Sequence, residues 1–163
     1  MITSSFVVSL FGIGLALGQT VPNVTVATVS QAFMSSGIVP DVLSSFNPTA
    51  ILNVVFLDQA TNSSVDVTPG MNLTMEQTLM EPQFFLSAND TSLDQQTYVL
   101  VIVDPDAPTP QNATEAQFRH MLAGDLHVNG STSSGLGAPL TNTSAALTEF
   151  VNPTPPAGSD PHR

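Results

Sequence analysis

The sequence predicts a mostly β domain, because short segments rich in β-branched and aromatic residues alternate with residues that favour turns. The segments predicted as strands are Val24–Val29, Ile51–Leu57, Tyr98–Val103 and, from a weaker pattern, Met121–Val128. The turn pairs between them are Asn47-Pro48, Pro69-Gly70, Asp104-Pro105 and Asn129-Gly130. No heptad or other repeat interrupts this alternation, which favours a β-sandwich with short helices.

Two segments need their own interpretation. Ser30–Gly37 predicts a short helix, with a serine that can cap its start and a glycine at its end. Tyr98–Val103 is a continuous apolar run without alternation, which predicts a central strand covered on both faces. It leads directly into Asp104-Pro105-Asp106-Ala107-Pro108, where prolines can hold two carboxylates rigidly at the end of the strand.

Length and charge restrict the class of protein. A chain of 163 residues with 42% hydrophobic residues fits one folded domain with a single core. The formal net charge is −11, with 13 acidic residues against two arginines. Binding to nucleic acid or to an anionic membrane surface needs clustered Lys and Arg, so neither is expected. The absence of cysteine excludes disulfides, a thiolate nucleophile and a thiolate metal site.

The N-terminus predicts export. The apolar run Phe6–Leu17 is too short to span a bilayer and ends in the small-x-small pattern Ala16-Leu17-Gly18. We therefore expect residues 1–18 to be a signal peptide and residues 19–163 to form the secreted domain, without a further membrane span; the alternative is a buried N-terminal helix. Seven Asn-x-Ser/Thr sequons also indicate a secreted glycoprotein. They are Asn23, Asn62, Asn72, Asn89, Asn112, Asn129 and Asn142.

Two ordered motifs carry a family resemblance. The first is Asp104–Pro108 followed by Phe118-Arg119-His120-Met121-Leu122 and Asn129-Gly130, and the second is Pro155–Arg163, with the sequence PPAGSDPHR. Together they resemble the two signatures of the phosphatidylethanolamine-binding protein family, over a stretch from about Ile51 to the last residue. Because that family continues beyond the His-Arg pair, the resemblance implies a product truncated at the C-terminus, without the last strands and helix.

The resemblance implies a cleft at one end of the β-sandwich that binds phosphate or a similar small anion without a cofactor. Motif position assigns its wall to Asp104, Asp106, Pro108, Phe118, His120, Pro155 and His162. The residue types agree with this assignment, because imidazole N–H groups can bind an anion and a carboxylate behind each ring favours its charged form.

Other interpretations stay open at these positions. Asp104 and Asp106 can serve as Asx-turns, His120 can be a half-buried ring, and His162 can belong to a disordered tail. His127 lies outside both motifs, and we expect it to be structural. Two histidines and two aspartates would suit Zn²⁺, but the family resemblance and the long gap between the histidines argue against a metal.

Enzymatic interpretations find little support, so we expect no catalytic residues. Asp104 and Asp106 lie two apart in a proline-fixed turn, and the sequence has neither a Gly-x-Ser-x-Gly elbow nor a glycine-rich phosphate loop. Serines are numerous, but nothing in the sequence places a Ser-His-Asp triad. The expected function is non-enzymatic binding of a small anion or phospholipid headgroup. One alternative is an interaction module that inhibits a protease such as a serine carboxypeptidase, and another is a surface or wall glycoprotein without a specific ligand.

Overall fold

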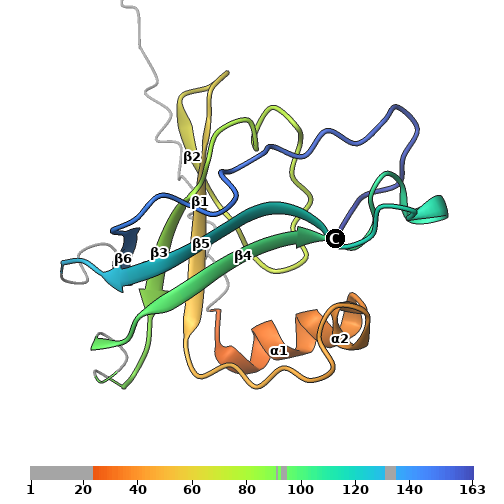
Figure 1. Ribbon diagram of the computed structural model, residues 1–163. Coiled ribbons are helices and arrows are strands. Elements are labelled where there is room, and N and C mark those ends of the chain that lie inside the picture. The colour runs from red at the N-terminus through yellow and green to blue at the C-terminus, as the bar shows by residue number, and fades with distance from the viewer. Residues whose placement is uncertain (1–23, 91, 93–94, 131–134) are drawn as a thin grey trace, which may run out of the picture.

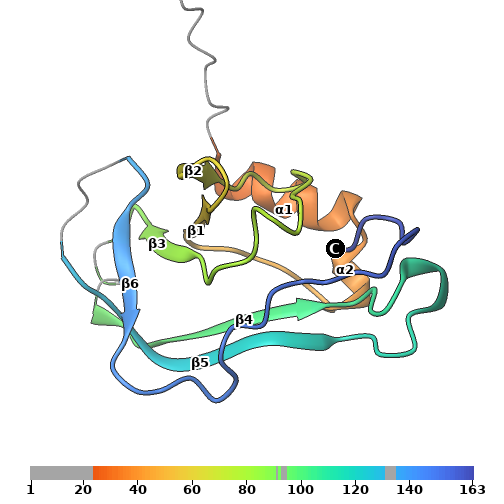
Figure 2. The same cartoon turned by 90° about the horizontal axis from the view of Figure 1, so that it is seen from above.

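Six strands form one antiparallel sheet that curls, so that its two end pairs of strands lie across from each other (Figures 1 and 2). The computed structural model describes residues 24–90, 92, 95–130 and 135–163; the expected signal peptide and the sequon at Asn23 lie outside them. The strands follow the order β2-β1-β3-β6-β5-β4 across the sheet. Their bounds are β1 Ile51–Asp58, β2 Ser63–Asp66, β3 Gln83–Ser87, β4 Tyr98–Asp104, β5 Phe118–Val128 and β6 Ala138–Asn142. The predicted mostly β class with few short helices is confirmed.

Helix α1 spans Val26–Ser35, so the strand predicted at Val24–Val29 is wrong. The physical reason is a capping box: the Thr28 amide donates to Thr25 Oγ1 at 3.2 Å, and the Thr25 amide donates to Thr28 Oγ1 at 2.9 Å. The alternation of Thr and Val that suggested a strand is therefore the first turn of the helix. A second short helix, α2, spans Ile38–Asp41.

The hydrophobic core lies inside the curl of the sheet. Its buried side chains come from β3, β4, β5 and β6, and they are Phe84, Leu86, Leu100, Met121, Ala123, Leu126 and Leu140. β5 is the longest strand, and it pairs with β4 along one edge and with β6 at its C-terminal end. The predictions of β1 and of most of β5 are confirmed, whereas β2, β3 and β6 were not anticipated.

The position predicted for β4 is wrong. The strand stands at the end of the sheet order, not at its centre, and Val99 and Val101 are 68% and 52% exposed. Leu100, between them, is buried in the core. Apolar residues therefore occupy both faces of β4 although only one face is covered in the described part of the chain, and composition alone could not reveal this.

The segment after β6 carries the C-terminus to the site. It follows the edge of β5, where Leu122 exchanges backbone hydrogen bonds with Thr148 and the Val151 amide donates to the His120 carbonyl at 2.9 Å. Residues 152–163 then run, without regular secondary structure, to the C-terminal end of β4 (Figure 1). The two sequence motifs meet there.

Candidate ligand-binding site

Asp104 closes β4 and is the centre of the site. Its side chain is buried, and Oδ1 accepts the Asp106 amide at 2.7 Å. This contact is the Asx-turn that the sequence left open as an alternative. It occupies only one carboxylate oxygen, so Oδ2 remains available to face the second motif.

Two imidazoles face Asp104 Oδ2. His162 Nδ1 lies 2.6 Å from this oxygen, and His120 Nε2 lies 3.8 Å from it. His120 is buried on β5, and its Nδ1 lies 2.7 Å from the Val151 carbonyl. Because a carbonyl only accepts, Nδ1 carries a hydrogen and Nε2 is left directed toward Asp104. The rings of Phe118 and His120 pack edge to face, with their centroids 5.0 Å apart.

Asp106 points to the other side of the loop and holds Arg163. Its Oδ2 accepts the backbone N–H of Arg163 at 2.8 Å and the Nε–H at 3.0 Å, while Oδ1 accepts from Nη2 at 2.8 Å. Arg163 also donates through Nη1 to Asp41 Oδ2, in the last residue of α2, at 2.8 Å. The hydrogen bond from Arg163 lowers the pKa of Asp106, and the two carboxylates raise the pKa of Arg163.

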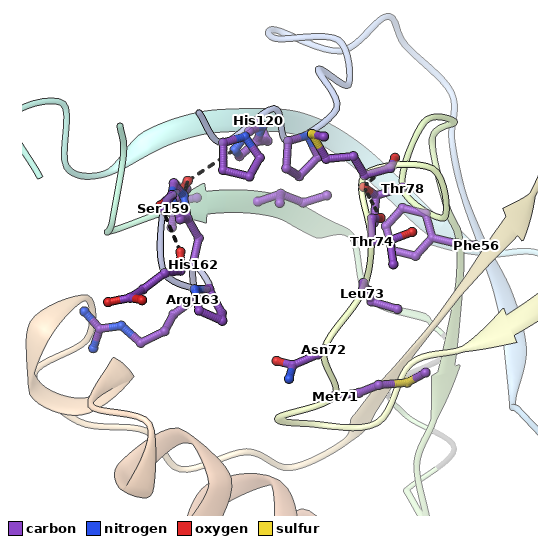
Figure 3. Close-up of a pocket in the computed structure, with 18 residues that line it drawn as sticks. Phe56, Met71, Asn72, Leu73, Thr74, Thr78, His120, Ser159, His162 and Arg163 are labelled. Carbon is purple, nitrogen blue, oxygen red and sulfur yellow. Dashed lines mark hydrogen bonds and ion pairs between the residues drawn. The ribbon is translucent and has the colours of Figure 1, made fainter. Parts of the chain in front are cut away.

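A cavity of about 510 Å³ opens beside these groups (Figure 3). His120, Ser159, His162 and Arg163 lie on one side of it, and the loop Met71–Thr78 lies on the other. A smaller hollow of about 150 Å³ lies against the first motif. Its lining includes Pro108, Phe118, Pro155 and both histidines of the site.

Six of the seven predicted site residues therefore line one or both hollows. Asp106 lines neither, because both its oxygens face Arg163. His127 lies away from the site, opposite Thr141 of β6. The two motifs meet at the end of β4, and this brings together Phe118, His120, Pro155 and the other predicted residues that line the hollows.

The sequence interpretation missed three features of the site. Arg163 was quoted in the second motif without a role, although its position next to His162 was a usable signal. Ser159 lies in the same motif, but no spacing rule connects it with His162, whose Nε2 is 3.0 Å from its Oγ. Nothing in the composition of Met71–Thr78 indicated that it would form the opposite wall.

The chemistry available at Asp104 depends on protonation. With His120 neutral, its Nε2 is an acceptor beside a carboxylate; with His120 protonated, Nε2 becomes a donor that an anion can share. Within residues 24–90, 92, 95–130 and 135–163, no group of three or more His, Asp or Glu side chains is arranged to hold a metal ion.

The fold and the site together define a β protein with a histidine- and aspartate-lined pocket at the end of a curled sheet. Residues 63–163 match the model of the phosphatidylethanolamine-binding protein family. The chain belongs to this family.

Similarity to individual proteins supports the assignment to this family. The chain is 31% identical to the carboxypeptidase Y inhibitor of Saccharomyces cerevisiae over 155 residues, which cover 82% of this chain and 68% of the inhibitor. It is 29% identical to Protein FLOWERING LOCUS T of Arabidopsis thaliana, over 80% of this chain and 64% of the relative. It also resembles the crystal structure of carboxypeptidase Y inhibitor complexed with the cognate proteinase, with a TM-score of 0.69 and 26% identity over 84% of this chain and 68% of that one.

Proposed function

We propose that this chain is a non-enzymatic binding protein whose pocket takes a phosphate group, from a small molecule or from a phospholipid headgroup. The observation that carries the proposal is the position of His120 Nε2, 3.8 Å from the buried Asp104 carboxylate and on the wall of the 510 Å³ cavity. This proximity also favours a ligand pocket over a wall glycoprotein without a ligand, in which nothing would keep the two groups together.

The proposal assigns different roles to the two histidines. Both His162 nitrogens have partners within the protein, Asp104 and Ser159, so this ring completes the wall and orients its neighbours. His120 uses only Nδ1 on the backbone, and its Nε2 can donate to a ligand oxygen once the ring is protonated. The proposal therefore places the ligand contact on His120 and the wall contacts on His162.

Calorimetric titration with inorganic phosphate tests the pocket. His120→Ala should abolish binding, while His127→Ala, on the same strand but away from the cavity, should bind as the unaltered chain does. Phosphate binding by a folded His120→Ala variant would refute the role of His120. A soluble headgroup phosphate, titrated in the same way, separates the two sources of the ligand.

A protease partner is the second candidate. It is supported by the similarity to a carboxypeptidase Y inhibitor, which includes a structure of that inhibitor in complex with its proteinase. We expect inhibition of a serine carboxypeptidase by the purified chain. If inhibition persists in His120→Ala, the protease contacts and the anion pocket are independent; if no inhibition is measured for the unaltered chain, this candidate fails.

We also propose that the protein is exported and glycosylated. All six sequon asparagines in the described residues are exposed, as attachment of a glycan requires. No helix in the described ranges is long and apolar enough to cross a bilayer. Expression in a glycosylating host, followed by enzymatic removal of N-glycans and mass measurement, should give a loss of mass; an intracellular product of unchanged mass would contradict the proposal.

A further inference from the structure

Ser159, His162 and Asp104 form a continuous line of hydrogen-bonding side chains. Ser159 Oγ lies 3.0 Å from His162 Nε2, and His162 Nδ1 lies 2.6 Å from Asp104 Oδ2 (Figure 3). These are the groups and the order of a serine nucleophile, its general base and the carboxylate that orients the base. Ser159 and His162 lie three residues apart in the tail, and Asp104 comes from the other motif.

The positions of the hydrogens on Ser159 and His162 follow from the hydrogen-bonding partners of these two side chains. An ionised carboxylate only accepts, so His162 Nδ1 carries a hydrogen and, in the neutral ring, Nε2 has a free lone pair. The Ser159 hydroxyl has one hydrogen and two acceptors in reach, His162 Nε2 at 3.0 Å and the Asp160 carbonyl at 2.9 Å. When the hydrogen points to Nε2, His162 can remove it as the hydroxyl oxygen attacks.

We propose that Ser159 is an activated nucleophile that accepts an acyl group from an activated carboxylic ester, an activity beyond the proposed binding function. Ser159 Oγ forms a bond to the carbonyl carbon while its proton passes to His162 Nε2. The bond from that carbon to the leaving oxygen then breaks, and the leaving group takes the proton from Nε2. The products are an ester on Ser159 and the free alcohol, with His162 neutral again.

The backbone around Ser159 limits the rate of acyl transfer in both directions. Acylation and deacylation both pass through an oxyanion that backbone N–H donors stabilise. The Ser159 amide instead donates to the Pro156 carbonyl at 3.1 Å, and the Arg163 amide donates to Asp106 at 2.8 Å. Both steps are therefore slow, and acylation needs an activated ester with a good leaving group. The ester formed on Ser159 is not activated, so we expect it to accumulate at one acyl group per chain.

Another serine in the chain serves as a matched control. Ser144 Oγ donates to Asp125 Oδ2 at 2.8 Å, so it has a carboxylate partner but no imidazole between them. Ser144 is also exposed, so access does not protect it. If an exposed hydroxyl beside a carboxylate were sufficient for acylation, Ser144 would react as readily as Ser159.

The experiment treats the full chain with p-nitrophenyl acetate and measures released nitrophenolate and the acetylated peptide. The chain has no lysine, so background acylation of side-chain amines is absent. We expect one acetyl group per chain on Ser159, removable by hydroxylamine, in the unaltered protein and in Ser144→Ala. Ser159→Ala should lose this label, and His162→Gln should slow its formation by about 100-fold or more.

A second variant keeps the proposal testable if His162→Gln does not fold. Ser159→Cys leaves the turn intact and places a stronger nucleophile beside the same base, so it should react faster than the unaltered chain. The proposal is overturned if the unaltered chain stays unlabelled, if the acetyl group lies on another residue, or if Ser159→Cys reacts no faster than a free thiol. Phosphate binding by Ser159→Ala, measured separately, shows whether the pocket itself fails or only the nucleophile.

Discussion

Replacing Asp106 by asparagine should loosen the C-terminal tail. The Asp106 side chain is 5% exposed and receives three hydrogen bonds from Arg163, one from the backbone and two from the guanidinium. Asparagine keeps the shape and one carbonyl oxygen but loses the charge and the second acceptor. The variant therefore tests the ion pair without creating a cavity.

The magnitude follows from the burial of the two partners. A hydrogen bond to a charged group contributes about 1.5–3 kcal/mol, and two of the three are lost or weakened. Solvent reduces this value, because the Arg163 side chain is 32% exposed. We expect a loss of about 2 kcal/mol in the free energy of unfolding, which for a chain of this size lowers Tm by roughly 4–8 °C.

Thermal unfolding followed by circular dichroism at several pH values measures the effect. The pKa of Asp106 is lowered in the folded state, so its contribution is fully present above the unfolded pKa of about 4 and is lost as the pH falls through the folded pKa. The difference between Asp106→Asn and the unaltered chain should thus be largest at neutral pH and shrink below about pH 4.

The matched control is Asp41→Asn, which removes the other carboxylate on Arg163. The contact between Asp41 and Arg163 is also 2.8 Å long, but the Asp41 side chain is 51% exposed. The expected loss in the free energy of unfolding is therefore only about 0–1 kcal/mol. Equal Tm values for Asp106→Asn and the unaltered chain at pH 7, or a difference that persists undiminished in acid, would refute the assignment of the ion pair.

Two further pairs of variants test side-chain packing and backbone conformation. Met121→Ala removes a side chain that is 3% exposed in the core and should cost about 2–5 kcal/mol, while Val101→Ala, at 52% exposed, should cost much less; denaturant unfolding of both gives the comparison. Gly137→Ala should destabilise strongly, because φ is +106° and the new Cβ would lie 2.2 Å from the Leu86 carbonyl oxygen. Gly130→Ala, with φ +97° and no atom within 4 Å, measures the backbone strain alone, so equal Tm values for the two glycine variants would contradict the steric argument.

The sequence predicted the strands whose apolar pattern is strong and local. Ile51–Leu57 and Tyr98–Val103 are strands in the structure, and both are mostly apolar segments rich in β-branched and aromatic residues. The strands β3 and β6 are shorter, and they are held in the sheet by pairing with each other and with β1 and β5. No local sequence pattern predicts this long-range pairing. The helix at Val26–Ser35 was partly missed because a Thr-Thr capping box looks like the alternation of a strand.

The site was predicted in its residues but not in its connections. The two motifs identified Asp104, His120 and His162, and the structure brings all three together. Which oxygen faces which ring depends on how the tail lies along β5, and that depends on long-range hydrogen bonds such as the one from Val151 to His120. The sequence could not show that Asp106 faces away from the pocket, because both aspartates occupy equivalent positions in the motif.

The two aspartates of the first motif hold different parts of the candidate site. Asp104 faces the histidines, and Asp106, two residues later, faces Arg163, so one short loop holds both the pocket and the tail that completes it. The tail has no regular secondary structure of its own between residues 152 and 163, so its position depends on these side-chain contacts. Asp106→Asn should therefore weaken phosphate binding as well as stability, because His162 loses the support of its neighbour Arg163. Asp41→Asn, which leaves the Asp106 contacts in place, should preserve binding; a pocket that binds phosphate equally well in both variants would show that His120 and Asp104 suffice without the tail.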